Sequence, residues 1–169
     1  MPLRRRRRPL PWIVVAIALL AAVMRLWSGA ANQPPAETLA AEEYRVVRVV
    51  DGDTLLLEDD VRVRLIGVDT PETVAPDRPV EPWGPEATEF TGQFVSGGRV
   101  RLEFDRERVD RFDRFLAYVW VGDRMLNEEL LRAGLATAPK HYRYGDAMRR
   151  RFQKAEDEAR RARIGIWSE

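Results

Sequence analysis

Short β-type segments separated by turn-forming residues are the feature that most restricts the fold of this chain. Residues 44–50 are rich in β-branched side chains and end at the turn sequence 51–53, Asp-Gly-Asp. Residues 54–58 and 61–66 follow on either side of the second turn sequence, Asp59-Asp60, with apolar and polar residues alternating in the second of them. This pattern predicts three consecutive short strands joined by tight turns.

The second half of the chain adds two strands and three helices. Strands are predicted at residues 99–104 and 115–121. One amphipathic helix is predicted from Pro85 to the stop signal Gly97-Gly98, a short one at residues 127–133 before Gly134, and a long one at residues 146–163. Five short strands interrupted by helices, without strict alternation, favour a mainly β fold with helices: a five-stranded OB-fold barrel with three packed helices.

Residues 1–31 do not fit this domain and are typical of an export leader. Arg4 to Arg8 form a basic run, residues 10–24 are uncharged and almost wholly apolar, and small residues follow. An apolar run of this length spans about 22 Å as a helix, which is short of the roughly 30 Å hydrocarbon core of a bilayer. These features predict a signal peptide that directs the domain out of the cytoplasm.

Arg25 leaves a second interpretation open, in which the leader is retained as a membrane anchor. If its side chain reaches outward, the apolar stretch extends over residues 10–27. Both interpretations keep the arginine cluster on the cytoplasmic side and place the domain outside, as a secreted, periplasmic or anchored protein. Residues 32–42, which include two adjacent prolines, are expected to be a flexible linker to the domain at residues 43–169.

The domain that follows the leader is acidic, although the whole chain carries a formal net charge of +1. Residues 1–31 contain six arginines and no acid, so 22 basic and 27 acidic side chains remain, a net charge of −5. Such a domain needs a local group of arginines or a bound cation to attract nucleic acid. The absence of cysteine and the single histidine, His141, exclude disulfides, thiolate chemistry and histidine-rich zinc sites.

Carboxylates gather at the ends of predicted strands, in residues 50–54 and 64–72. Asp53 and Asp69, together with the backbone carbonyl of Thr70 and waters, would suit a hard cation such as Ca²⁺ or Mg²⁺. The spacing of the acids excludes an EF-hand loop. Spacing alone leaves open the alternative that the acids of the first segment only stabilise a turn.

Arg64, Arg114 and Glu72 add the groups that phosphodiester hydrolysis requires. Arginine presents a planar fork that matches phosphate oxygens, and a carboxylate can orient or deprotonate the attacking water. Taken singly, Arg64 could equally pair at the surface with Asp59 or Asp60, and Glu72 could be an exposed loop acid. Their joint occurrence beside the candidate cation ligands favours the catalytic interpretation.

From residue 44 to residue 169 the chain resembles the staphylococcal nuclease, or thermonuclease, family. The matching segments follow one another in the family's order: Asp51-Gly52-Asp53-Thr54, Arg64-Leu65, Val68-Asp69-Thr70-Pro71-Glu72, Trp83-Gly84-Pro85-Glu86-Ala87, Asp110 to Arg114, Leu116-Ala117-Tyr118-Val119, Asn127-Glu128, Gly134-Leu135-Ala136 and Gly165-Ile166-Trp167-Ser168-Glu169. The resemblance implies a five-stranded barrel with three helices, in agreement with the elements predicted above.

The resemblance also implies an activity and a role for each site residue. It implies a Ca²⁺-dependent endonuclease that acts on DNA, RNA or both and releases 3′-phosphate and 5′-hydroxyl ends. Nothing in the sequence indicates an oligomer, so we expect a monomer. Asp53, Asp69 and the Thr70 carbonyl would bind Ca²⁺, Glu72 would be the general base, Arg64 and Arg114 would hold the scissile phosphate, and Arg111, Phe112 and Tyr142 would contact the nucleotide.

Two residues next to Arg114 depart from the family pattern. Phe112 and Asp113 stand where the family usually has tyrosine and glycine. The loss of a phenol removes one hydrogen bond to phosphate, and an acid beside an arginine that binds phosphate opposes an anionic ligand. We expect weaker substrate binding with an intact catalytic set.

Two further classes of protein remain as alternatives to the hydrolase. One is an OB-fold barrel that binds nucleic acid without cutting it, and the other is a membrane-tethered OB-fold domain that serves protein contacts. Because all five side chains Asp53, Arg64, Asp69, Glu72 and Arg114 are present, the sequence favours the hydrolase.

Overall fold

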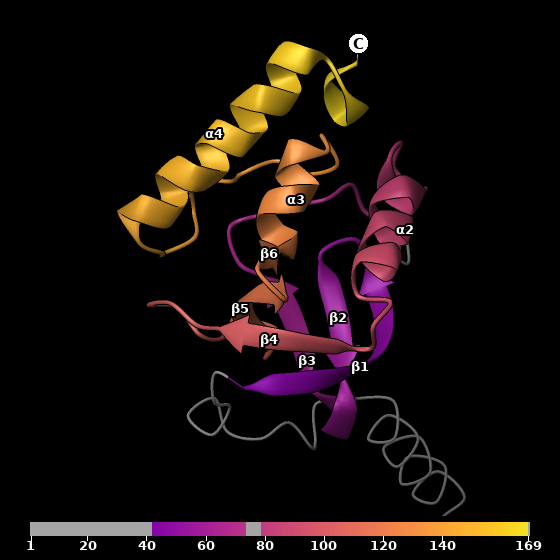
Figure 1. Ribbon diagram of the computed structural model, residues 1–169, viewed down its shortest axis with the longest axis vertical. Helices are drawn as coiled ribbons and strands as arrows, with labels where there is room; N and C mark the ends of the chain where they lie inside the picture. Colours follow the sequence, from indigo (N-terminus) through magenta and orange to yellow (C-terminus); the bar gives the residue numbers. More distant parts are fainter. Residues whose placement is uncertain (1–41, 74–78, 169) are drawn as a thin grey trace, which may run out of the picture. The chain divides into compact units, whose positions relative to one another are not determined.

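The strands form one sheet that closes on itself as a barrel (Figure 1). The computed structural model describes residues 42–73 and 79–168, so the predicted leader and nearly all of the predicted linker lie outside the described residues. The strands are β1 (Glu43–Asp51), β2 (Thr54–Leu57), β3 (Arg62–Leu65), β4 (Arg99–Glu103), β5 (Phe115–Val121) and β6 (Arg124–Met125). Their order is β3-β2-β1-β4-β5-β6, and a further pairing of β3 with β5 closes the barrel.

The closure is parallel, whereas every other pairing in the sheet is antiparallel. Tight turns join β1, β2 and β3 as hairpins, because the Asp-Gly-Asp and Asp-Asp sequences supply turn residues. In the parallel pair, Val63 lies opposite Phe115 and Arg64 lies opposite Leu116. This register brings Arg64 next to the start of β5 and therefore close to Arg114.

Three α-helices pack around the barrel: α2 (Gly84–Phe94), α3 (Leu126–Arg132) and α4 (Asp146–Ala162). Pro85 occupies the first turn of α2, where its missing N–H costs no hydrogen bond. Short 3₁₀ turns, η1 (Glu58–Asp60) and η2 (Gly165–Trp167), complete the described part of the chain. Figure 1 shows α3 between α2 and α4 above the strands.

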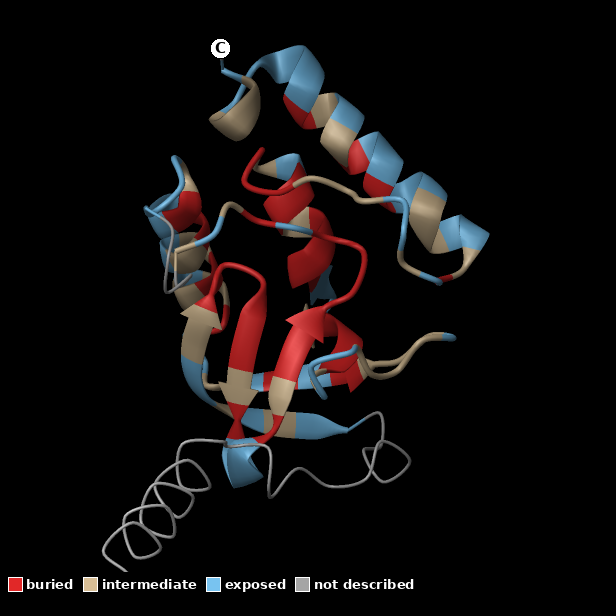
Figure 2. Cartoon of the chain, turned by 180° about the vertical axis from the view of Figure 1, so that it is seen from behind, coloured by how far each residue is buried: buried red, intermediate tan, exposed pale blue. Residues whose placement is uncertain are grey.

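The core fills the barrel and continues into α3, where Figure 2 shows the buried residues concentrated. Asn127 ties α3 to β5 and to the residue that follows β3: its Oδ1 accepts from the Val119 N–H at 2.9 Å, and its Nδ2 donates to the Ile66 carbonyl at 2.9 Å. Phe152 of α4 is fully buried and meets Tyr118 edge-on, with ring centroids 5.9 Å apart. Two helices are therefore fastened to β5, the strand that also closes the barrel.

The predicted fold is confirmed, since the structure is a closed five-stranded barrel with three helices. The predicted bounds of α3 and α4 agree with the observed ones to within one residue. The two-residue strand β6 was not predicted, because two residues are too few to show a periodic pattern. Within the described ranges, no helix has the length and apolar character needed to cross a membrane.

Candidate active site

The first part of the site is the turn between β1 and β2, which packs directly against α2. Gly52 is buried there, and a Cβ atom at this position would lie 2.8 Å from both the Ala87 Cβ and the Thr70 Oγ1. The Thr91 hydroxyl of α2 donates to the Gly52 carbonyl at 2.5 Å. Glycine is required because the turn and the Thr70 loop approach the helix more closely than a side chain allows.

Asp53 is a buried carboxylate at the centre of this turn, only 5% exposed. One oxygen accepts from the Thr70 N–H at 2.9 Å and forms an ion pair with Arg64, and the other accepts from the Thr54 hydroxyl at 3.0 Å. Burial raises the pKa of Asp53, although the Arg64 charge and the Thr70 hydrogen bond oppose the rise. Asp53 is therefore a buried carboxylate with both oxygens held by neighbours, Arg64 and Thr70 on one and Thr54 on the other.

Arg64 bridges two acids from different parts of the chain. Its guanidinium group pairs with Asp53 and donates to Asp69 Oδ1 at 2.5 Å. Burial disfavours its charged form, but the charges of Asp53 and Asp69 outweigh burial, so the pKa of Arg64 is raised. The surface pairing with Asp59 or Asp60, which the sequence left open, is wrong, because Arg64 is only 6% exposed and points toward the site.

Asp69 is presented to solvent by a bridge between two loops. Its backbone N–H donates to the Thr137 carbonyl at 3.0 Å, and the Thr137 N–H donates back at 2.8 Å. The Asp69 side chain is 59% exposed, in contrast to its buried partner Arg64. Asp69 therefore offers a carboxylate that solvent, a cation or a ligand can reach.

Glu72 lies on an exposed loop that Asp51 fastens to the barrel. The buried Asp51 carboxylate accepts from the Thr73 hydroxyl at 2.7 Å and from the Gly52 N–H at 2.8 Å. Burial would raise the pKa of Asp51, but hydrogen bonds with Glu72, Thr73 and Gly52 lower it overall. Asp51 is therefore more than a turn residue, because it holds the loop that carries Glu72.

Arg114 follows a tight turn and is held in place by the residue that begins the turn. Asp110 Oδ2 accepts from Arg114 Nε at 2.8 Å and pairs with Nη2 at 2.7 Å. Asp110 Oδ1 accepts from the backbone N–H groups of Phe112 and Arg114, at 2.8 and 3.0 Å. Asp113 completes the turn with a φ of 58°, a backbone region that favours glycine.

Two adjoining cavities meet at Arg64, Asp69 and Arg114, which line both of them. The smaller, of about 270 Å³, is also lined by Val50, Asp51, Asp53, Thr54, Thr70 and Glu72. The larger, of about 410 Å³, is also lined by Glu107, Asp110, Arg111, Phe112, Leu116, His141 and Tyr142. The carboxylate-rich cavity and the aromatic one are thus joined at the two arginines.

Aromatic and cationic side chains form the walls of the larger cavity. The Phe112 ring is 56% exposed, with the Arg111 and Arg114 guanidinium carbons 4.7 and 5.4 Å from its centroid. The rings of His141 and Tyr142 also line this cavity, with centroids 4.3 Å apart and planes tilted by 32°. Burial raises the pKa of Tyr142, despite the opposing charge of Arg64. Exposed rings beside guanidinium groups can accept a base and its phosphate together.

The oxygen atoms of the smaller cavity suit a hard cation. Asp53 and Asp69 supply two carboxylates, and within the described residues no group of three or more acidic or histidine side chains could hold a metal ion. A cation here would therefore also need the Thr70 carbonyl and waters as ligands. Among the described residues, none is a hydrogen-bond partner of the buried Thr70 hydroxyl, which is consistent with a cation at this position.

Each of the nine site residues named from the sequence lines at least one of the two cavities. Their individual roles stay predictions. Sequence reasoning missed Asp51 and Asp110, which hold Glu72 and Arg114. The position of Asp110 at the start of a turn, four residues before Arg114, was the signal that could have found it.

Comparison with protein-family models matches residues 62–169 to the family described as staphylococcal nuclease homologue. The chain is 43% identical over 159 residues to a thermonuclease of Staphylococcus intermedius, covering 92% of this chain and 94% of that protein. It is 41% identical over 159 residues to a thermonuclease of Staphylococcus hyicus, with the same coverage. It is 38% identical over 127 residues to the endonuclease YncB of Bacillus subtilis, covering 72% of this chain and 59% of that protein.

Proposed function

The chain belongs to the staphylococcal nuclease family and is a nuclease, and we propose that it is a Ca²⁺-dependent endonuclease that hydrolyses DNA, RNA or both as a monomer. We further propose that its products carry 3′-phosphate and 5′-hydroxyl ends. The observation that carries this proposal is the meeting of two arginines, two carboxylates and Glu72 around adjoining cavities. The names of the relatives, thermonuclease and endonuclease, support the same class of reaction.

Arg64 and Arg114 would bind the scissile phosphate between the two cavities. Both guanidinium groups are oriented before any substrate arrives, Arg64 by Asp53 and Asp69, and Arg114 by Asp110. Such preorganised donors stabilise the charge that develops on the phosphate oxygens in the transition state. Three arginines and six acids line the two cavities, so the arginines alone do not make the site positive, and a bound cation would have to add to the attraction for phosphate.

Glu72 would act as the general base that takes a proton from the attacking water. It is exposed and lines the smaller cavity, next to the position where the two arginines would hold the phosphate. Its loop is fixed through the hydrogen bonds of Asp51 to Thr73. A general base must lie within hydrogen-bond reach of the proton it removes, so a fixed loop favours catalysis.

Asp53, Asp69 and the Thr70 carbonyl would hold the cation. A bound Ca²⁺ would neutralise phosphate charge and favour the ionised form of a water near it. Arg64 then has a second use, because its contacts with Asp53 and Asp69 keep these carboxylates together in the absence of the cation. A buried ion pair of this kind is costly to form and is more readily explained by function than by stability.

We also propose that the protein is exported, with residues 1–31 acting as a cleaved signal peptide or as a retained anchor. These residues lie outside the described part of the chain, so the proposal rests on the basic run and the apolar run alone. Intact mass of the protein recovered from its natural host decides between the two. A mass that lacks residues 1–31 supports cleavage, whereas full-length protein in the membrane fraction supports the anchor.

One assay tests the catalytic proposal. Purified protein is incubated with plasmid DNA and with RNA, each with Ca²⁺ or with a chelator. We expect degradation only with Ca²⁺, and a loss of about a hundredfold or more in Glu72→Gln and in Arg114→Ala. Glu129→Gln, a helix residue that lines neither cavity, is the control. Binding without cleavage, or cleavage that survives the chelator, would contradict the proposal.

The ends of the products need their own measurement. A 5′-labelled oligonucleotide is cleaved, and the labelled fragments are then compared before and after treatment with phosphatase. If the fragments carry 3′-phosphates, the phosphatase should change their electrophoretic mobility. Fragments that a polymerase can extend without prior phosphatase treatment would overturn this part of the proposal.

A further inference from the structure

The segment of residues 138–145 contains no helix or strand, yet two of its residues, His141 and Tyr142, line the larger cavity. It runs from the bridge between Asp69 and Thr137 to the start of α4. Its backbone polar groups are bonded to side chains of neighbouring segments. The position of this wall of the cavity therefore depends on a few identifiable side chains.

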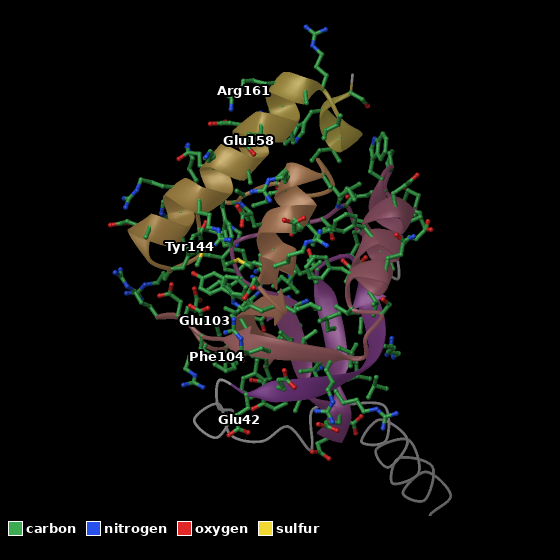
Figure 3. The ribbon with its side chains drawn as sticks, viewed as in Figure 1. Glu42, Glu103, Phe104, Tyr144, Glu158 and Arg161 are labelled. Carbon is green, nitrogen blue, oxygen red and sulfur yellow. The ribbon has the colours of Figure 1, made fainter. Side chains whose placement is uncertain are left out.

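Two acids from the chain that follows β4 hold the end of this segment. Asp105 Oδ2 accepts from the Gly145 N–H at 2.9 Å and from the Tyr118 hydroxyl at 2.8 Å. Glu107 Oε2 accepts from the Arg143 N–H at 3.1 Å. We call these two carboxylates and the N–H groups that they bind the loop latch. Figure 3 labels Tyr144 near the start of α4, and Glu103 and Phe104 at the end of β4.

Helix α4 supports the segment from the other side. The Arg149 guanidinium donates to the Tyr142 carbonyl at 3.2 Å and lies over the Tyr144 ring, 4.7 Å from its centroid. Tyr144 is buried and packs on Phe152, with ring centroids 5.8 Å apart. The helix contacts fix the segment to α4, and the latch fixes it to the connection between β4 and β5.

Both latch acids belong to the connection that also carries Phe112 and Arg114, which line the cavity. Residues 104–114 form this connection between β4 and β5. The latch thus ties the Tyr142 wall to the Arg114 wall through two hydrogen bonds. These hydrogen bonds therefore set the distance between the rings of His141 and Tyr142 and the guanidinium group of Arg114, which together would bind one nucleotide.

The charge of Glu107 supports a positioning role. Glu107 lines a cavity in which a phosphate would bind, and a carboxylate there opposes an anionic ligand. Its bond to the Arg143 N–H gives this unfavourable charge a structural reason. For Asp105, partial burial opposes ionisation, but hydrogen bonds from Gly145, Tyr118 and Arg106 lower its pKa overall.

We propose that Asp105 and Glu107 are positioning residues that set the affinity for the nucleic-acid strand by holding the Tyr142 segment against the Arg114 wall. The inference rests on the proposed nuclease function. It predicts that loss of the latch weakens substrate binding and leaves the chemical step, at Glu72 and Arg64, nearly intact.

The test compares Asp105→Ala, Glu107→Ala and Glu107→Gln with wild type on a single-stranded DNA oligonucleotide in Ca²⁺. We expect KM to rise about fivefold in each alanine variant with kcat within about twofold of wild type, since a lost hydrogen bond weakens binding by about this factor. Glu107→Gln keeps an acceptor for the Arg143 N–H and should restore KM. Glu129→Ala, which removes surface ion pairs with Arg124 and Arg132 instead, is the control for general destabilisation.

A second measurement does not depend on catalysis. Amide hydrogen exchange across residues 139–145 should be faster in both alanine variants than in Glu129→Ala and wild type. If KM and exchange in the alanine variants match those of Glu129→Ala, the latch proposal is overturned. If the wild-type protein cleaves no nucleic acid, the proposed function fails, and a positioning role in catalysis fails with it, whereas exchange still reports whether the two acids hold the segment.

Discussion

Asp110 holds Arg114 twice, with one carboxylate oxygen on the backbone N–H at 3.0 Å and the other on the side-chain Nε at 2.8 Å. The same residue therefore fixes both the turn and the direction of the guanidinium group. Since Asp110 lines the larger cavity beside Arg114, its charge also offsets part of the arginine's attraction for phosphate. Asp110 therefore favours substrate binding by orienting Arg114 and opposes it by its negative charge. Substitution of Asp110 can separate the two effects.

We predict that Asp110→Ala lowers kcat/KM about tenfold, and Arg114→Ala lowers it about a hundredfold or more, because a misdirected guanidinium retains some of its effect. Asp110→Asn keeps the oxygen that accepts from the backbone and should fall between Asp110→Ala and wild type. Steady-state cleavage of an oligonucleotide measures all three. Equal losses in Asp110→Ala and Arg114→Ala would mean that Asp110 does more than orient Arg114.

Asp113 adopts a φ of 58° directly before Arg114, where a side chain strains the backbone. We predict that Asp113→Gly raises the free energy of unfolding by about 0.5–1 kcal/mol, as measured by urea unfolding. It should also lower KM, because it removes a negative charge next to the phosphate site. Asp113→Asn removes the charge and keeps the side chain, so it should lower KM without the full gain in stability. If KM is still lowered at high salt, the charge of Asp113 is not the cause, because salt screens charge interactions.

Gly52 tests the contact between the catalytic turn and α2. A Cβ here would lie 2.8 Å from the Ala87 Cβ and the Thr70 Oγ1, so we predict that Gly52→Ala costs about 1–3 kcal/mol of stability and raises the Ca²⁺ concentration needed for activity. Gly92 lies in α2, and a Cβ added there would have no atom within 4 Å. Gly92→Ala should therefore stabilise the protein, by about 0.5–1 kcal/mol. Thermal unfolding of the two variants and wild type measures both effects. If Gly52→Ala is as stable as wild type, the turn can shift to accommodate a side chain.

The lowered pKa of Asp105 predicts a pH dependence of stability. The unfolded carboxyl has an ordinary pKa of 3.8, so between this value and the lower folded pKa the unfolded state binds more protons. The contribution of Asp105 is then fully present well above pH 3.8 and is lost as the pH falls through the folded pKa. Urea unfolding of wild type and Asp105→Asn should show a difference that is constant near neutral pH and shrinks in acid. A difference that stays the same at pH 2 would contradict this account.

The barrel and its helices were predictable from the sequence because local patterns specify them. Turn residues at 51–53 and 59–60 mark the hairpins, and Pro85 and Gly134 mark a helix start and a helix end. The observed bounds of α3 and α4 lie within one residue of the predicted bounds, because capping and apolar periodicity act over a few residues. These are short-range effects that the order of residues contains directly.

The pairing of Arg64 was not predictable in the same way. By spacing it could have met Asp59 or Asp60, but the structure buries it between Asp53 and Asp69. Its neighbourhood is set by the hairpin register opposite Thr54 and by the parallel closure of β3 on β5. The alternation of apolar and polar residues placed Arg64 on the polar face of its strand. This pattern could not show that Arg64 is buried on that face.

The sequence by itself determined which elements form, which residue types are available for catalysis, and that the domain is acidic with arginines at separate points. Only the tertiary structure decided that Arg64, Arg114 and Tyr142 line one cavity, that Asp110 orients Arg114, and that Asp105 and Glu107 hold the Tyr142 segment. The physical reason is range: propensity and periodicity act over a few residues, whereas charge interactions and hydrogen bonds depend on distances in space. Those distances exist only after β3 closes on β5 and α4 packs against the barrel.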